Sequence, residues 1–266
     1  LTGTLDGIEQ TTGGKTLATV SVRGFRIAIP IREMLVLDDR MPSGRAYADY
    51  MNRLNRILGT MLGAEIDFIV KGIDSTTHSA VASRREAMLR KRQTFYLGKD
   101  VSGNPYIYPG RLVEARVIAV AEKVLRVEAF GIECAIFARD LSWQWVSDVR
   151  DLYSVGDRVL IRVQEISGKD AEHLSIRADI RSTFSETSVD NLKKCQVQSK
   201  YAGKVTDLRG GVVYIRLNNG VNAIAHTCYD SRMPGKKDDV SFAVTRLDEE
   251  HGVAVGIITR IIKRNL

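Results

Sequence analysis

The residues best suited to chemistry lie on one stretch, 210–226, which reads Gly-Gly-Val-Val-Tyr-Ile-Arg-Leu-Asn-Asn-Gly-Val-Asn-Ala-Ile-Ala-His. Successive side chains on a strand point to opposite faces. One face of this stretch is therefore aliphatic, and the other carries Tyr214, Arg216, Ile224 and His226. An aromatic ring, a cation and an imidazole on one sheet face could stack bases and hold phosphates. An ordinary half-buried hairpin is the alternative, because fold patterning does not fix function.

The turn inside this stretch is Asn218-Asn219-Gly220, which separates the two alternating runs. An Asn-Gly pair favours the positive backbone dihedrals of a tight hairpin turn. We therefore expect both residues of this pair to adopt positive φ, and the two runs to pair as antiparallel strands.

A second group of candidates is the basic segment 84–92, which reads Arg-Arg-Glu-Ala-Met-Leu-Arg-Lys-Arg. Its five cations in nine residues, Arg84 and Arg85 among them, could line a track for phosphates. They could equally form a solvated helix face, which is the commoner role of a charge run. Both interpretations remain open at this point.

The elements that must position these residues are mostly short strands, because apolar residues alternate between clusters of turn residues. One amphipathic helix is expected over residues 43–62, where Tyr50, Leu54 and Leu58 recur at helical spacing. A short helical region is expected around Trp143 and Trp145. The predicted strands are 2–6, 16–22, 24–30, 64–73, 80–83, 112–120, 125–129, 131–137, 159–166, 174–177, 197–207, 212–217, 221–226, 239–246 and 253–258.

These strands fall into three similar units. Each unit has a hairpin with a central glycine (Gly24, Gly131 or Gly220), a connection of variable length, and a last strand followed by a cation. Five short strands with a helix before the fourth is the pattern of the oligonucleotide-binding barrel. The sequence therefore predicts a mainly β protein of three tandem five-stranded barrels, the first with a long helical insertion between its strands 3 and 4. The expected boundaries are a divergent first barrel at 1–96, a linker at 97–110, a second barrel at 111–181, a linker at 182–192 and a third barrel at 193–266.

Motifs in the second and third units resemble the RNA-binding domain that is repeated in the ribosomal protein S-one. The third unit supplies Tyr214, Gly220-Val221-Asn222 and His226, and the first, most divergent unit supplies Gly24 and Ser83-Arg84-Arg85. The second unit supplies Gly131-Ile132-Glu133, Asp140-Leu141-Ser142, Val155-Gly156-Asp157-Arg158-Val159 and Leu174-Ser175-Ile176-Arg177.

The resemblance implies that outward residues of strands two and three bind single-stranded RNA. Carried over by position, they fall on Tyr214, Ile224 and His226 in the third unit, on Arg126, Ala135 and Phe137 in the second, and on Thr19, Ala28 and Pro30 in the first. The third unit is therefore expected to bind best. The expected nucleic-acid-binding residues are Tyr214, His226, Arg216, Ile224, Phe137, Arg126, Arg84, Arg85 and Arg177.

Composition narrows the classes of function. The chain of 266 residues has a formal net charge of +7, which fits a polyanionic partner. Three widely spaced cysteines without a Cys-x-x-Cys motif argue against a disulfide framework or a zinc site and for a reducing, cytoplasmic setting. No apolar run approaches the roughly 20 residues that span a bilayer. No phosphate-binding loop, dinucleotide motif or metal-ligand set is present, so we expect no cofactor, no metal and no catalysis.

Three hypotheses follow from these patterns. The first is a non-enzymatic binder of single-stranded RNA with low sequence specificity, with single-stranded DNA as an open alternative. The second is a structural or protein-interaction module of a ribosomal, phage or mobile-element assembly. The third is a nuclease subunit.

Overall fold

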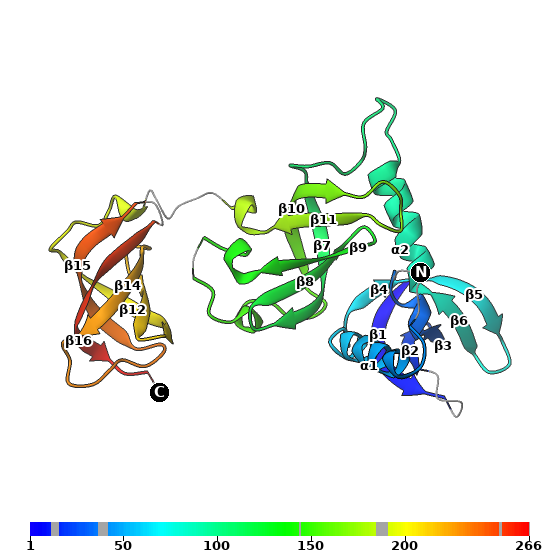
Figure 1. Ribbon diagram of the computed structural model, residues 1–266, viewed down its shortest axis with the longest axis horizontal. Coiled ribbons are helices and arrows are strands. Elements are labelled where there is room, and N and C mark those ends of the chain that lie inside the picture. The colour runs from blue at the N-terminus through cyan, green and yellow to red at the C-terminus, as the bar shows by residue number, and fades with distance from the viewer. Residues whose placement is uncertain (12–15, 37–41, 144, 185–190, 250–251, 266) are drawn as a thin grey trace. The chain divides into compact units, whose positions relative to one another are not determined.

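The chain is mainly β and divides into two compact units. The computed structural model describes residues 1–11, 16–36, 42–143, 145–184, 191–249 and 252–265 (Figure 1). The first unit comprises Leu1–Phe137 and Asp148–Thr183, and the second comprises Ala138–Ser147 and Phe184–Leu266. The first unit therefore holds two of the three predicted β units, and most of the predicted linker at 182–192 lies outside the described residues.

The first sheet has six strands in the order β4-β1-β2-β3-β6-β5. Helix α1 (Arg45–Gly59) falls between β3 and β4, and its Leu54 and Leu58 are buried in the core of this sheet. The helix begins later than residue 43 because Gly44 precedes it with a φ of 63°. The strands are β1 (Thr2–Gln10), β2 (Thr16–Val22), β3 (Phe25–Pro30), β4 (Glu65–Asp67), β5 (Ile69–Asp74) and β6 (Ser79–Ser83).

The second sheet lies in the same unit and has five strands in the order β11-β10-β7-β8-β9. Among the described residues of the predicted helical region, the helical turns are two 3-10 turns, Ala138–Asp140 (η3) and Val149–Asp151 (η4), and Trp143 and Trp145 lie outside both. The strands are β7 (Leu112–Ala121), β8 (Val124–Ala129), β9 (Ile132–Phe137), β10 (Arg158–Ser167) and β11 (Ser175–Asp179).

The basic segment forms helix α2 (Arg84–Arg92), which starts directly after β6 and continues into a π-helical turn, Gln93–Leu97 (η2). The Ser83 hydroxyl accepts a hydrogen bond of 3.0 Å from the Glu86 amide and so caps the helix. The helix and its π turn contact the hairpin of β8 and β9. The Tyr96 hydroxyl donates to the carbonyl of Ala129 at 2.8 Å, and Arg92 Nε donates to the carbonyl of Gly131 at 2.6 Å.

The second unit contains a closed barrel in the cyclic order β12-β13-β14-β16-β15. Gly203 and Gly256 let neighbouring strands approach closely: a Cβ on Gly256 would lie 2.0 Å from the carbonyl oxygen of Ala243. The strands are β12 (Lys200–Arg209), β13 (Val212–Leu217), β14 (Asn222–Cys228), β15 (Asp239–Asp248) and β16 (Val253–Lys263). Across the described parts of both units, no helix has the length and apolar character needed to cross a membrane.

Candidate nucleic-acid interface

The hairpin of β13 and β14 has the alternation that the sequence predicts. Val213, Ile215 and Leu217 are buried in the barrel core, whereas Tyr214 and Arg216 are partly exposed on the outer face. Tyr214 is the register partner of Ile224 on β14 and of Asp207 on β12. We call the outer face around Asp207, Tyr214 and Ile224 the β13–β14 platform.

The turn of this hairpin differs from the expectation. Gly220 has a φ of 86°, but Asn219 does not adopt positive φ, so only one residue of the Asn-Gly pair does. The Asn219 side chain instead accepts a hydrogen bond of 3.2 Å from the Val221 amide. Its amide nitrogen also contacts the Cys195 sulfur at 3.1 Å. Side-chain hydrogen bonds therefore stabilise this turn together with the positive φ of Gly220.

Cations flank the platform on one edge. Arg216 is the register partner of Lys204 on β12 and of Asn222 on β14. Its Nη1 donates to the Asn222 side-chain oxygen at 2.9 Å, and partial burial lowers the pKa of its guanidinium. Within the described residues Arg216 has no carboxylate partner, so its positive charge is available to an anion. Lys204, which the sequence did not single out, is exposed and lies 3.9 Å from an Asp239 carboxylate oxygen, a long and solvent-exposed ion pair.

His226 lies at the other edge of the platform, at an irregularity in the sheet. Ala225 pairs with Gly256 and Thr227 pairs with Ile257, which leaves His226 as the extra residue of a bulge. Its side chain is exposed. The strict alternation that was expected to carry His226 onto the same face as Ile224 therefore ends at Ala225.

The platform also holds an aromatic side chain that sequence reasoning did not assign to it. The ring of Trp145 stacks on that of Tyr214, with centroids 4.3 Å apart and planes 11° apart. Trp145 Nε1 donates to an Asp207 carboxylate oxygen at 3.3 Å. In the sequence, the only indication of this contact is the pair of tryptophans itself, because both are far from Tyr214 along the chain.

On the equivalent face of the second sheet, one expected residue is exposed and another is held in an ion pair. Phe137, at the end of β9, is 50% exposed, and its register partner on β8 is Val124. Further along, Arg126 lies opposite Ala135, and its guanidinium bonds to Glu133. Phe137 thus remains accessible, while Arg126 is part of an ion-pair network.

Helix α2 provides that network, and it corrects the expected role of Arg84. The Arg84 guanidinium is 0% exposed and bonds to Glu128 and, at 2.8 Å, to Glu133 on the second sheet. It also donates to the carbonyl of Met34 at 2.7 Å. A fully buried guanidinium cannot reach a phosphate, so Arg84 joins the two sheets of the first unit and does not line an outer track.

The neighbouring cations of α2 are likewise engaged. Arg85 forms an ion pair of 3.2 Å with Glu172, and Lys91 bonds to Asp67. Arg92 is buried, and the burial lowers the pKa of its guanidinium. The fifth cation, Arg90, is exposed, so the segment is mainly a packed helix that leaves one cation facing solvent.

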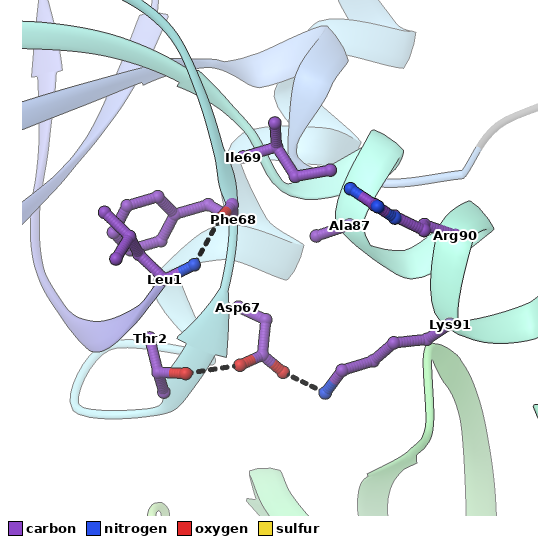
Figure 2. Close-up of a pocket in the computed structure, with 8 residues that line it drawn as sticks. All are labelled: Leu1, Thr2, Asp67, Phe68, Ile69, Ala87, Arg90 and Lys91. Atoms are coloured by element: carbon purple, nitrogen blue, oxygen red, sulfur yellow. Dashed lines mark hydrogen bonds and ion pairs between the residues drawn. The ribbon is translucent and has the colours of Figure 1, made fainter. Parts of the chain in front are cut away.

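Two depressions adjoin this network. One, of about 190 Å³, is shown in Figure 2, where Asp67 lies between the Thr2 hydroxyl and the Lys91 ammonium. The other, of about 250 Å³, contains Arg158, which forms ion pairs of 3.0 Å with both Glu65 and Glu114. Carboxylates neutralise Lys91, Arg116 and Arg158 in these depressions, whereas Arg90, which lines the first of them, is exposed.

The remaining expected residues lie apart from these sites. Arg177 on β11 is 75% exposed and forms an ion pair of 3.3 Å with Glu165. In the first sheet Thr19 is buried opposite Ala28, and the expected face there carries no aromatic side chain. The structure therefore groups Tyr214, Arg216 and Ile224, with His226 at their edge, and keeps Phe137, Arg126 and Arg177 on the second sheet.

Comparison with known proteins gives one family match and several curated relatives. Residues 107–177 match the model of the S1 RNA binding domain family. The small ribosomal subunit protein bS1 of Coxiella burnetii is 22% identical over 273 residues, covering 97% of this chain and 44% of that protein. The bS1 protein of Mycobacterium tuberculosis is also 22% identical, over 171 residues that cover 64% of this chain and 34% of that protein. The chain thus spans less than half the length of these relatives.

Solved structures resemble the chain only distantly. In a complex of a/eIF2alpha, aDim2p and rRNA from Pyrococcus horikoshii, one chain is 18% identical with a TM-score of 0.27, over 34% of this chain and 56% of that one. The identification therefore depends on the family match and the curated relatives. The matched segment includes β7 to β10, the hairpin at Gly131 and the Leu174–Arg177 motif. Residues 107–177 of this chain are therefore similar to the S1 RNA binding domain, and the chain as a whole is similar to the ribosomal protein bS1.

Proposed function

We propose that this chain is a non-enzymatic protein that binds single-stranded RNA with low sequence specificity. The observation that supports this most is the β13–β14 platform, where Tyr214 and Ile224 lie beside the cations Lys204 and Arg216. Aromatic rings stack on any base, and cations neutralise phosphates without reading sequence. The S1 RNA binding domain in the same chain points to the same ligand class.

The architecture we propose is three tandem oligonucleotide-binding barrels, at 1–96, 111–181 and 193–266. Strand order supports it. In each unit strand 1 pairs with strand 2, strand 2 with strand 3, and strand 4 with strand 5. In the first unit strand 4 is divided into β4 and β5 around Phe68, and α1 is the insertion between strands 3 and 4.

Within this architecture the three barrels have different roles. The third supplies the main RNA platform, and the second contributes Phe137 at the accessible end of β9. The face of the second sheet at Glu128 and Glu133 is occupied by α2, so it is unavailable to RNA. Linked weak sites raise the apparent affinity when one strand can reach several of them.

The relation to bS1 supports association with the ribosome and a cytoplasmic location as parts of this proposal. Single-stranded DNA is a second candidate ligand, because no platform residue is placed to read a 2′-hydroxyl. A protein-interaction role is favoured by one observation: the strand face at Glu128 and Glu133 already binds a segment of protein, α2.

A salt-titrated binding comparison tests the proposal. The full chain is titrated with a fluorescent oligo-RNA, the DNA of the same sequence, and the RNA duplex. We expect the single-stranded RNA to bind most tightly, with an affinity that falls linearly with salt on logarithmic axes. Failure to bind any single strand at low salt would contradict the proposal, and tightest binding of the duplex would contradict the stacking mode.

A further inference from the structure

The segment that carries Trp143 and Trp145 uses the same groups that a bound nucleotide would use. Trp145 stacks on the Tyr214 ring, and its indole N–H donates to Asp207 at 3.3 Å. Asn222, beside Arg216, donates from its side-chain amide to the carbonyl oxygen of Trp143 at 3.2 Å. One ring face and two polar side chains of the platform are thereby engaged within the second unit.

This arrangement has the chemistry of a stacked base. A flat aromatic ring lies almost parallel to Tyr214, its N–H meets an acceptor at the edge, and a carbonyl oxygen meets the Asn222 amide donor. Bases offer the same three features: a π-face, ring-edge donors and exocyclic carbonyl acceptors. Only one object can stack on this face of Tyr214 at a time.

We propose that Trp145 is an internal competitor that covers the β13–β14 platform until single-stranded RNA displaces it. This inference rests on the proposed RNA-binding function of the platform. The bound RNA base takes the place of the indole on Tyr214, and a carbonyl oxygen of the nucleotide takes the place of the Trp143 carbonyl as the acceptor for the Asn222 amide.

The cover is held weakly enough to be displaced. The Trp145 side chain remains 41% exposed, and its contacts on the platform are one ring stack and one long hydrogen bond. Binding to a site that is open only part of the time lowers the apparent affinity by the open fraction. An aromatic stack stabilises by about 0.5–1.5 kcal/mol, which corresponds to a roughly two- to tenfold loss of affinity. The cover therefore lowers the apparent affinity of every strand that stacks on Tyr214 by the same factor.

Substitution of Trp145 tests the inference through affinity. Trp145→Ala in the full chain should bind oligo-RNA about two- to tenfold more tightly than the parent. In a chain that already carries Tyr214→Ala, the same substitution should have no effect, because there is no platform left to cover. Tyr229→Ala is the matched control: it removes an aromatic side chain of the second unit that is 71% exposed and lies outside the platform.

Fluorescence provides a second measurement that does not depend on affinity. The chain has two tryptophans, so Trp143→Phe leaves Trp145 as the single reporter and keeps the backbone carbonyl at position 143. Saturating oligo-RNA should shift the emission of Trp145 to the red and increase its quenching by acrylamide, because displacement exposes the indole to water.

The outcomes separate this inference from the function on which it rests. If the parent binds no single strand, the proposed function fails. If the parent binds, but Trp145→Ala binds equally or more weakly, or RNA protects Trp145 from acrylamide, the inference fails. Protection would mean that Trp145 clamps the base against Tyr214.

Discussion

Arg84 and Glu128 form a buried ion pair that joins helix α2 to the second sheet, with the two side chains 0% and 1% exposed. Glu128 also bonds to Arg116 at 2.9 Å, and Arg116 in turn bonds to Asp67 on the first sheet. The charges of α2, β4, β7 and β8 are thus neutralised in one network inside the first unit.

Arg84→Ala should destabilise the first unit by about 3–5 kcal/mol, because it leaves the Glu128 charge buried without its partner. Hydrogen exchange of the β8 and β9 amides measures the change. Arg177→Ala is the control, since its guanidinium is 75% exposed and its loss should change stability by no more than about 0.5 kcal/mol. If these amides are equally protected from hydrogen exchange in the two variants, the Arg84–Glu128 ion pair does not stabilise the contact between the sheets.

Acid should weaken the same network. Burial acts to raise the pKa of Glu133, but the charges of Arg84 and Arg126 outweigh it and hold that pKa below its ordinary value of 4.5. Burial also opposes ionisation of Asp67, yet hydrogen bonds from Arg116, Lys91 and Thr2 hold its pKa well below 3.8. At a pH below the ordinary pKa values of these two carboxyls, the folded state therefore binds fewer protons than the unfolded state. As a result, the free energy of unfolding decreases as the pH is lowered.

Comparison with Glu133→Gln measures this effect. The parent should be the more stable protein above about pH 5, and its advantage should shrink as the pH falls to about 3. Denaturant unfolding at a series of pH values gives the difference. An advantage that stays constant over this range would contradict the lowered pKa of Glu133.

Gly256→Ala should destabilise the closed barrel by about 1–3 kcal/mol, the usual cost of overpacking. The added methyl group would lie 2.0 Å from the Ala243 carbonyl oxygen and 2.7 Å from Phe242 Cζ. Gly235→Ala is the control, because the nearest atom to its methyl group would be an Asp238 oxygen at an ordinary 3.5 Å. Tryptophan fluorescence during denaturation reports on the second unit, since both tryptophans belong to it. Equal midpoints would refute the close approach of β15 and β16.

Lys204→Ala should weaken binding to all RNA sequences equally and reduce the salt slope by about 1, as expected for one lost phosphate contact. Lys204→Arg keeps the charge and should keep the slope. Binding isotherms at several salt concentrations supply both values. If the salt dependence of binding is unchanged in the alanine variant, Lys204 does not contact an RNA phosphate.

The hairpin of β13 and β14 could be predicted from the sequence because its signals are local. Alternation over Val212–Leu217 fixes which side chains are buried, and the Asn-Asn-Gly segment marks the turn. The bulge at His226 could not be predicted, because it depends on the parallel pairing of β14 with β16, about 30 residues away in sequence.

The contacts of helix α2 could not be predicted from the sequence, because the carboxylates that pair with its arginines are distant along the chain. Five cations in nine residues look the same whether they face water, phosphate or buried carboxylates, and Glu128 and Glu133 lie 44 and 49 residues further along the chain. Trp145 was missed for a similar reason, since it meets Tyr214 only in the folded second unit. Sequence patterns thus identified the elements and the platform strands, whereas tertiary contacts decided which cations and rings are available.

Tyr214→Ala tests the central proposal most directly, with Tyr214→Phe as the control that keeps the ring. Titration of the full chain with a fluorescent oligo-RNA at low salt should show the alanine variant binding more weakly by about 1–3 kcal/mol, the usual value of one base–aromatic stack. The phenylalanine variant should bind like the parent. An alanine variant that binds as tightly as the parent would contradict the assignment of the β13–β14 platform as the RNA site.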